Sequence, residues 1–466
     1  MSGMGTRLGA LDQLFLRLET PTTPMHVGGV LVFGPPVRDR PHPDALRARP
    51  VQTSPFDLVL RRRGRGHEWE RARDLTPPVG HVELPPPGDD RQLMAAVSRL
   101  HGRHLDRAGP LWECHVIDGL AGGRFALYYK IHHACIDGVS AIRRLEAALS
   151  ADPDHPTPPV WAVEPERRPP RPATDGGDAR ARPGVTAHLR TAAELTRRLG
   201  ALAATARDRD PGRTATPYTA PDSVLNACLG AERSVAWQRL PLDGVRALAA
   251  ATGTTINDVA LALCGAVLRE HLLGRDAMPG RPLVAMVPVS LRGTGAGADA
   301  GNQVSSILCK LGTDLADPRA RLTAVARSAS DGKQMLRAMS PAAAAAFSLV
   351  YTLPAVAAQL AGLARYAPLP WNVVVSNVAG PRQQLYLDGA PLEAVYPVSL
   401  LFERQALNFT LVSCRDHLDV GLLACARSVP DLGAVATGLV RAYDELRTSV
   451  DRAGPSSPPR PTGPPT

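Results

Sequence analysis

The chain has 466 residues, 44% of them hydrophobic, which is the composition of a globular protein with about two or three domains. Its formal net charge is +9, but aromatic residues make up only 4% and no zinc-finger or RNA-binding signature occurs, which argues against a nucleic-acid partner. The seven cysteines form no C-x-x-C pair, and most lie in apolar runs, so we expect reduced core residues.

The first part of the chain alternates between two kinds of pattern. Runs of β-branched and aromatic residues predict strands, and apolar residues spaced three and four apart predict helices. Residues 1–150 are therefore expected to form an N-terminal lobe. Strands are predicted at 27–33, 112–118 and 124–133, and helices at 92–104 and 139–149.

Composition changes sharply after residue 150. Nine of residues 151–184 are proline, which is typical of a linker with too little apolar surface to fold alone. Residues 185–208 place leucines on one face and arginines on the other, which predicts a helix that crosses between domains or lies on a membrane surface. We expect residues 151–231 to connect two lobes.

The second half repeats the alternation, so residues 232–451 are expected to form a C-terminal lobe and residues 452–466 a disordered tail. Thr255 and Asp258 have the spacing of a capping box at the start of a helix over 255–273. The other patterns predict strands at 234–242, 282–291, 371–381, 407–416 and 417–426, and a helix at 243–253.

The longest uncharged run is 338–364. It is long enough to span a bilayer, but it is rich in alanine and is interrupted by Pro354. We expect two short apolar helices here, packed in the core or lying against a membrane. Taken together, the two halves indicate an α/β or α+β protein with two related lobes and mixed sheets flanked by helices.

Residues 131–138 read IHHACIDG and close the predicted strand 124–133. Adjacent strand residues point to opposite faces, so His132 and His133 cannot share one metal ion or substrate, and no Cys/His cluster lies nearby. Asp137 stands where a helix N-cap belongs, and Gly138 permits a sharp turn. A neutral histidine there can take a proton from an alcohol, but a packed His-His pair in a loop is equally consistent.

Residues 132–138 have the form HHxxxDG, which resembles the signature of the CoA-dependent acyltransferase superfamily. Other stretches are similar to one branch, the bacterial wax ester synthase/diacylglycerol acyltransferase family, and the similarity extends from about residue 8 to 448. These stretches are LDQLFLRLETPTTPMHVGGVLVF (11–33), Pro110-Leu111-Trp112, Asn257-Asp258, AMVPVSLR (285–292), SNVAGP (376–381) and the block 392–425.

This resemblance implies two chloramphenicol-acetyltransferase-like lobes with a tunnel at their interface. It also implies an enzyme that uses acyl-CoA as a substrate, without a cofactor or a metal, and His133 as its general base. Asn257 could organise the oxyanion donors, or could simply bond its own backbone at a helix start. The implied catalytic group is His133, Asp137, His132, Gly138 and Asn257, and the implied substrate-binding group is Pro110, Leu111, Trp112, Asp258, Ser376 and Asn377.

The implied reaction is direct transfer, because Ser140 falls inside a predicted helix start and not on a nucleophile elbow. The acceptor would be diacylglycerol, giving triacylglycerol, or a long-chain alcohol, giving a wax ester. The alternatives are a condensation-type enzyme with another acceptor and a non-catalytic lipid-binding paralogue. We expect a cytoplasmic protein peripherally bound to the inner face of the plasma membrane or to lipid droplets.

Overall fold

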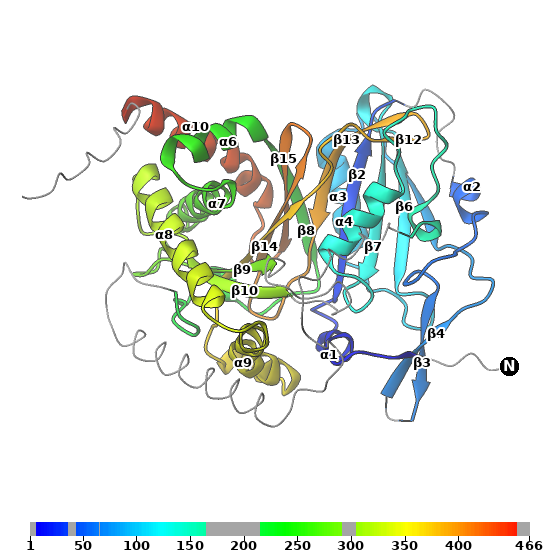
Figure 1. The fold of residues 1–466 in the computed structure, drawn as a ribbon, viewed down its shortest axis with the longest axis horizontal. Helices are drawn as coiled ribbons and strands as arrows, with labels where there is room; N and C mark the ends of the chain where they lie inside the picture. Colours follow the sequence, from blue (N-terminus) through cyan, green and yellow to red (C-terminus); the bar gives the residue numbers. More distant parts are fainter. Residues whose placement is uncertain (1–5, 36–42, 65, 165–214, 291–303, 454–466) are drawn as a thin grey trace, which may run out of the picture.

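A computed structural model describes residues 6–35, 43–64, 66–164, 215–290 and 304–453. In this part of the chain, two six-stranded sheets lie side by side, with a smaller three-stranded sheet near β6 of the first (Figure 1). Parallel and antiparallel pairs occur in both large sheets, and helices pack on them, as predicted.

The first large sheet has the strand order β12-β13-β2-β7-β6-β5. Successive residues of β2 point to opposite faces: Leu31 and Phe33 pack toward α4, whereas Val30 and Val32 pack toward α3. The sheet is therefore buried on both sides. Its elements from the first half are β2 (His26–Phe33), β5 (Val79–Glu83), α3 (Asp90–His101), β6 (Trp112–Asp118), β7 (Phe125–His132) and α4 (Gly138–Ala147).

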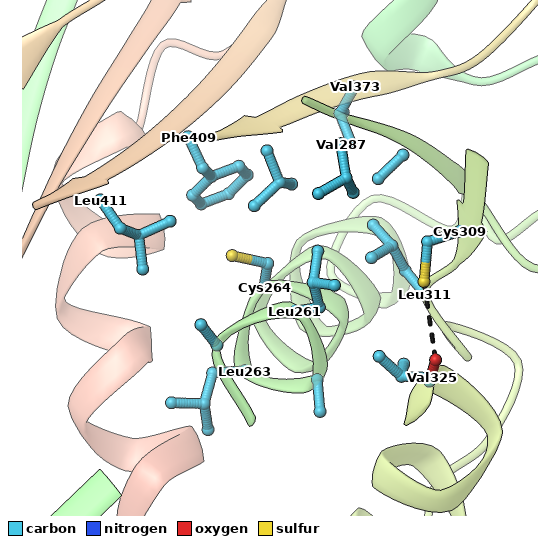
Figure 2. Close-up of a cluster of buried hydrophobic side chains, with 14 of the residues drawn as sticks. Leu261, Leu263, Cys264, Val287, Cys309, Leu311, Val325, Val373, Phe409 and Leu411 are labelled. Atoms are coloured by element: carbon cyan, nitrogen blue, oxygen red, sulfur yellow. Dashed lines mark hydrogen bonds between the residues drawn. The ribbon is translucent and has the colours of Figure 1, made fainter. Parts of the chain in front are cut away.

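The second large sheet has the order β10-β9-β11-β14-β15-β8, and α6, α7, α8 and α10 lie beside it (Figure 1). Side chains from its strands and from α7 form the core drawn in Figure 2, among them Leu261, Val287 and Phe409. The elements are β8 (Arg233–Pro241), α6 (Leu242–Thr252), α7 (Ile256–Leu273), β9 (Val284–Ser290), β10 (Val304–Lys310), α8 (Pro318–Arg337), β11 (Val373–Ala379), β14 (Leu407–Cys414), β15 (His417–Cys425) and α10 (Leu432–Ala453).

The capping box predicted for α7 is confirmed. The Thr255 hydroxyl accepts a hydrogen bond from the Asp258 N–H at 3.2 Å, and the Asp258 carboxylate accepts one from the Thr255 N–H at 3.0 Å. Further along α7, a Cβ on Gly265 would lie 2.1 Å from the Leu311 carbonyl oxygen. The helix therefore packs closer to the end of β10 than any larger residue would allow.

The remaining elements lie around these layers. α1 (Ala10–Leu18) packs against α9 (Pro341–Leu360), which is followed by the 3-10 turn η4 (Ala364–Tyr366). The small sheet has the order β1-β4-β3. Its strands and the other short elements are β1 (Thr6–Arg7), α2 (Pro43–Arg47), β3 (Leu58–Arg63), β4 (Gly66–Arg71), η1 (Ala121–Gly123), η2 (Val160–Ala162) and η3 (Val224–Asn226).

The prediction of two short helices in 338–364 is wrong, because α9 is a single helix that continues through Pro354. A proline inside a helix removes one hydrogen bond and crowds the preceding turn. The alanine-rich sequence around it has high helix propensity, and α9 packs on α1 and β10, which together offset that loss.

The predicted linker 151–231 is also partly wrong. Trp161 of η2 is fully buried and stacks on Trp112, with ring centroids 5.2 Å apart, so the linker starts inside the first core. Leu225 of η3 is likewise buried, in the second core. The helix predicted at 185–208 lies outside the described residues. α10 extends to Ala453, one residue beyond the predicted start of the tail at 452, and 454–466 lie outside the described residues.

Two strands from the second half complete the first sheet. β12 (Tyr386–Leu387) pairs with β13 (Ala390–Val398), and β13 pairs antiparallel with β2. β13 also contacts β15 of the other sheet, because the Val395 N–H donates to Asp419 Oδ2 at 2.9 Å while Arg239 Nε donates to Asp419 Oδ1 at 2.9 Å. The sheets therefore do not follow the predicted boundaries 1–150 and 232–451.

Gly421 marks the closest approach of β15 to β13, since a Cβ added there would lie 1.8 Å from the Pro397 carbonyl oxygen. We expect Gly421→Ala to lower the free energy of unfolding by about 3 kcal/mol, because fixed backbone cannot yield to an added methyl group. Chemical denaturation measures the change. Gly433→Ala is the control, because its Cβ would meet nothing within 4 Å. Equal stability of the two variants would contradict this packing.

Candidate active site

The HHxxxDG motif lies where β7 ends and α4 begins. The His132 N–H donates to the Leu111 carbonyl at 2.9 Å, and the His133 N–H donates to the Met25 carbonyl at 2.8 Å. The Cys135 N–H then turns the chain by donating to the His132 carbonyl at 2.8 Å. Hydrogen bonds to Leu111 and Met25, which lie on either side of β7, thus fix the backbone of the two histidines before α4 starts.

His133 is the half-buried histidine of the pair. Its ring stacks on Phe15 of α1, with centroids 4.3 Å apart and planes 25° apart. Its Nδ1 is enclosed and has no hydrogen-bond partner among the described residues. Desolvation lowers the pKa of His133, outweighing its own carbonyl, Asp137 and Asp12, which raise it. The ring is therefore neutral at neutral pH, the form that can accept a proton.

His132 is fully buried, which favours a structural role, and its place in the catalytic group stays a prediction. Its Nδ1 accepts a hydrogen bond from the Ala134 N–H at 3.1 Å, which places the ring proton on Nε2, 3.9 Å from Glu19 Oε2. Burial lowers the pKa of His132 to about 4. His132 thus packs away from the surface, as expected of one of the two histidines, and the expectation that His133 faces a substrate site stays a prediction.

Asp137 is the N-cap of α4, as predicted. Its Oδ1 accepts from the Ser140 N–H at 2.8 Å, and its Oδ2 accepts from the Ser140 hydroxyl at 3.1 Å. Ser140 therefore lies in the first turn of α4, as expected, with its hydroxyl bonded to Asp137. The carboxylate fixes the turn that follows His133.

The role predicted for Gly138, a sharp turn, is wrong. Gly138 is the first residue of α4, its φ is not positive, and an added Cβ would meet nothing within 4 Å. We expect Gly138→Ala to leave the free energy of unfolding unchanged or to raise it by about 0.5–1 kcal/mol, measured by denaturation. In Gly28→Ala, by contrast, the Cβ would lie 2.7 Å from the Tyr129 carbonyl oxygen, and stability should fall. Similar losses in both variants would contradict this assignment.

The sequence patterns did not identify the α1 residues near the motif. Phe15 stacks on His133, and Asp12 lies close enough for its charge to raise the pKa of His133. Glu19, just after α1, accepts from Arg107 Nε at 2.9 Å and approaches His132. These contacts join segments far apart in sequence, so only the resemblance of residues 11–33 could have pointed to α1.

The Pro110-Leu111-Trp112 motif lies in hydrophobic cores. Leu111 is 1% exposed and Trp112 is 2% exposed. Trp112 Nε1 donates to the Phe56 carbonyl at 2.8 Å, whereas Pro110 is half-buried and bridges to Val59 of β3. The burial favours core packing for Leu111 and Trp112. A substrate contact for the motif stays a prediction.

The other predicted residues lie on β11 and at the start of α7. Ser376 is half-buried and Asn377 exposed on β11, whose Val378 joins the same hydrophobic cluster as Ala141 of α4. The structure thus brings β11 beside the helix that follows the motif. Asn257 is half-buried in the first turn of α7, and its side chain forms no hydrogen bond to another described residue.

Asp258 caps its own helix, and Lys333 Nζ lies 3.8 Å from its Oδ1. The carboxylate is buried and engaged at the helix start, which favours a structural role. Its predicted substrate contact stays a prediction.

A buried lysine supports β7 just before the motif. Lys130 is fully buried, and its Nζ donates to the carbonyls of Leu100 at 2.9 Å and Arg103 at 2.8 Å. It also pairs with Glu113 Oε1 at 2.7 Å. The ammonium thus satisfies carbonyls at the carboxyl end of α3 and joins that helix to the sheet.

His101 lies beside this lysine, almost completely buried. Its Nδ1 is 2.8 Å from the Tyr128 hydroxyl and its Nε2 is 2.9 Å from the Ser399 carbonyl. A neutral ring satisfies both contacts when Nε2 donates and Nδ1 accepts. Desolvation, together with the positive charge of Lys130, lowers the pKa of His101 to about 3.

The described part of the chain contains at least two cavities. One, of about 40 Å³, lies between the first sheet and the carboxyl end of α4, lined by Leu31, Tyr129 and Leu145 among others. The second is an open groove of about 1250 Å³ beside α8 and α10. His133 lines neither, so the tunnel between the lobes stays a prediction.

Comparisons with known proteins identify the family of this chain. Residues 8–260 match the family model for the wax ester synthase/diacylglycerol acyltransferase catalytic domain, and residues 300–447 match that for the WS/DGAT C-terminal domain. A putative diacylglycerol O-acyltransferase from Mycobacterium tuberculosis is 38% identical over 463 residues, covering 95% of this chain and 100% of that protein.

Comparison with solved structures points to the same family. The wax ester synthase/diacylglycerol acyltransferase from Marinobacter aquaeolei is 34% identical, with a TM-score of 0.76 over 96% of this chain and 100% of that one. The first condensation domain of the calcium-dependent antibiotic synthetase shares the fold, with a TM-score of 0.57 at 17% identity over 98% of each chain. The two-lobed fold expected from the motif is thereby confirmed. The chain belongs to the wax ester synthase/diacylglycerol acyltransferase family and is an acyltransferase.

Proposed function

We propose that this enzyme transfers the acyl group of an acyl-CoA to the hydroxyl of diacylglycerol, forming triacylglycerol, or of a long-chain alcohol, forming a wax ester. The names of the Mycobacterium and Marinobacter relatives support these acceptors. The observation that carries the proposal is His133, half-buried on Phe15, with a pKa lowered by desolvation. Such a ring is free to accept a proton at neutral pH.

In the proposed reaction, His133 takes the proton of the acceptor hydroxyl while the hydroxyl oxygen attacks the thioester carbon of acyl-CoA. The carbon–sulfur bond then breaks, and the imidazolium returns its proton to the departing sulfur. Asp137 positions the histidine through the turn that it caps. The developing oxyanion needs a hydrogen-bond donor, and we assign this role to Asn257 at the amino end of α7.

The experiment compares two acceptors on the purified enzyme. Palmitoyl-CoA is offered with dioleoylglycerol or with hexadecanol, and both CoA release and the lipid product are measured. Formation of triacylglycerol or of wax ester supports the proposal, and the ratio of kcat/KM values identifies the preferred acceptor. CoA release without either ester, or no release at all, would contradict it.

We also propose that the enzyme works at the cytoplasmic face of a membrane or on lipid droplets, because its acceptors are insoluble in water. Within the described residues, no single helix has the length and hydropathy to cross a bilayer, and only α6 and α7 together, bent by 102°, pass that test. Cell fractionation should recover the enzyme with membranes or droplets and alkaline carbonate should release it. Recovery only in the soluble fraction would contradict this location.

A further inference from the structure

The second half of α9 exposes apolar side chains where a surface helix normally carries charges. Leu353 is 52% exposed and Leu360 is 49% exposed, and the two lie two helical turns apart on one face. Pro354, Ala357 and Ala361 are exposed beside them. We call these five residues the α9 face.

The adjoining side of α9 packs on α1. Val356 belongs to the same hydrophobic cluster as Leu14 and Phe15, and Gln359 Nε2 donates to the Leu18 carbonyl at 3.1 Å. Figure 1 shows α1 and α9 as neighbours at the lower edge of the molecule. Since Phe15 also stacks on His133, one helix separates the α9 face from the candidate base.

The apolar surface continues beyond the helix. Gly362, with a φ of +70°, ends α9, and Leu363 and Tyr366 are then 53% and 68% exposed. The Arg365 guanidinium lies 4.5 Å from the centre of the Tyr366 ring. Arg404 holds this turn by donating to the Ala367 carbonyl at 2.5 Å, so the exposed residues are presented on a fixed backbone.

The residues of α9 and η4 include no acidic side chain. The sequence contains no aspartate or glutamate between Asp331 and Asp388, an interval that includes all of α9 and η4. Arg365 lies within it, and Arg17 is exposed in the last turn of α1. An apolar face with a tyrosine and arginines at its margin is complementary to a lipid surface with anionic headgroups, and the exposed Asp222 near η4 is paired with Arg404.

We propose that the α9 face, with Leu363 and Tyr366, docks the enzyme on an anionic lipid bilayer, and that the acceptor reaches His133 past α1. Leu11, one turn before Phe15 on the same face of α1, is 40% exposed and offers an apolar contact along this path. The inference rests on the proposed function, since it supplies the surface from which a water-insoluble acceptor arrives.

The test uses the full chain and the double variant Leu353→Glu/Leu360→Glu. Leu273→Glu is the matched control, because Leu273 is also 52% exposed but lies at the end of α7. Binding to phosphatidylcholine vesicles with and without phosphatidylglycerol is measured by flotation. Transfer is measured with vesicle-borne dioleoylglycerol and with a short alcohol dissolved without vesicles, and thermal unfolding verifies that the variants are folded.

We expect the double variant to lose about tenfold or more in binding to anionic vesicles and in transfer to dioleoylglycerol, because two leucines leave the bilayer and two negative charges meet it. Transfer to the soluble alcohol should be unchanged, and Leu273→Glu should behave as the unmodified chain. Retained binding in the double variant overturns the proposal. The proposal is also overturned if the unmodified chain is a dimer, the double variant is a monomer, and the two bind vesicles equally.

The two proposals fail in different ways. If neither acceptor is acylated by any variant while vesicle binding still depends on Leu353 and Leu360, the proposed function is wrong and the docking surface stands. If the soluble alcohol is acylated and vesicle binding is indifferent to both leucines, the docking surface is wrong and the proposed function stands.

Discussion

His133→Ala should lower kcat by about 10²- to 10⁴-fold, because the acceptor hydroxyl then has no positioned base. The KM for acyl-CoA should change little, since the ring is expected to act on the acceptor. Loss of the stacking contact with Phe15 should reduce stability only modestly. Initial rates of CoA release, with thermal unfolding as the check on folding, measure the effect.

The pH profile of the unmodified enzyme gives a second readout for the same histidine. The pKa of His133 lies below its ordinary value because of desolvation, so the ring is already deprotonated at pH 7. Activity should therefore be flat near neutrality and fall only as the pH drops through that lowered pKa. The exposed His67 provides the control, and His67→Ala should leave rate and profile unchanged. Equal activity of His133→Ala and the unmodified chain would remove this histidine from the mechanism.

Acidification from pH 7 to pH 5 should destabilise the fold by about 4 kcal/mol through two buried histidines that are neutral in the native state. His101 and His132 have native pKa values of about 3 and about 4, against an ordinary value of 6.5. The unfolded chain therefore binds more protons in this range, so the stability that these residues contribute is present above pH 6.5 and is lost as the pH falls. Each of the two histidines contributes about 2 kcal/mol less to the free energy of unfolding at pH 5 than at pH 7.

The titration of Asp419 has the opposite effect on the stability of the fold. Burial raises its pKa to about 6, despite Arg239, so its native carboxyl binds a proton more readily than the unfolded one. Acidification to pH 5 thus stabilises the fold by about 1 kcal/mol through this group, which offsets part of the histidine effect. The two histidines have the larger combined effect, and the net change remains a loss of stability.

Denaturant unfolding at several pH values measures this dependence. In His101→Gln the loss between pH 7 and pH 5 should be smaller by about 2 kcal/mol, whatever the absolute stability of the variant. His67→Gln should keep the full dependence, since His67 is exposed on β4. A pH dependence that is the same in both variants would show that His101 does not remain neutral in the native state.

Local signals in the sequence predicted the elements that carry the motif. The capping box of α7, the Asp137 N-cap and the strand that ends at His132 all depend on residues within a few positions of one another. Such features follow from short-range hydrogen bonding and side-chain alternation, which a single sequence displays directly. The separation of roles between His132 and His133 followed from the same alternation.

Contacts between distant segments could not be predicted in this way. Nothing in the local pattern of β13 distinguishes pairing with β2 from pairing within the second sheet, and the clearance at Gly421 depends on that choice. Trp161 lies in a proline-rich stretch that resembles a linker, yet its ring fills a space beside Trp112. The contact of Phe15 with His133 likewise exists only once α1 has packed on the first lobe.

The pairing of β13 with β2 has a consequence for the synthesis of the chain. When the first half leaves the ribosome, β2 is an open edge strand, because the strand that covers it is made much later. The nascent first half therefore exposes unpaired backbone groups and apolar surface until residues 390–398 arrive, a state that invites aggregation and chaperone binding. A fragment ending before β13 is expected to be insoluble, although it contains the whole HHxxxDG motif.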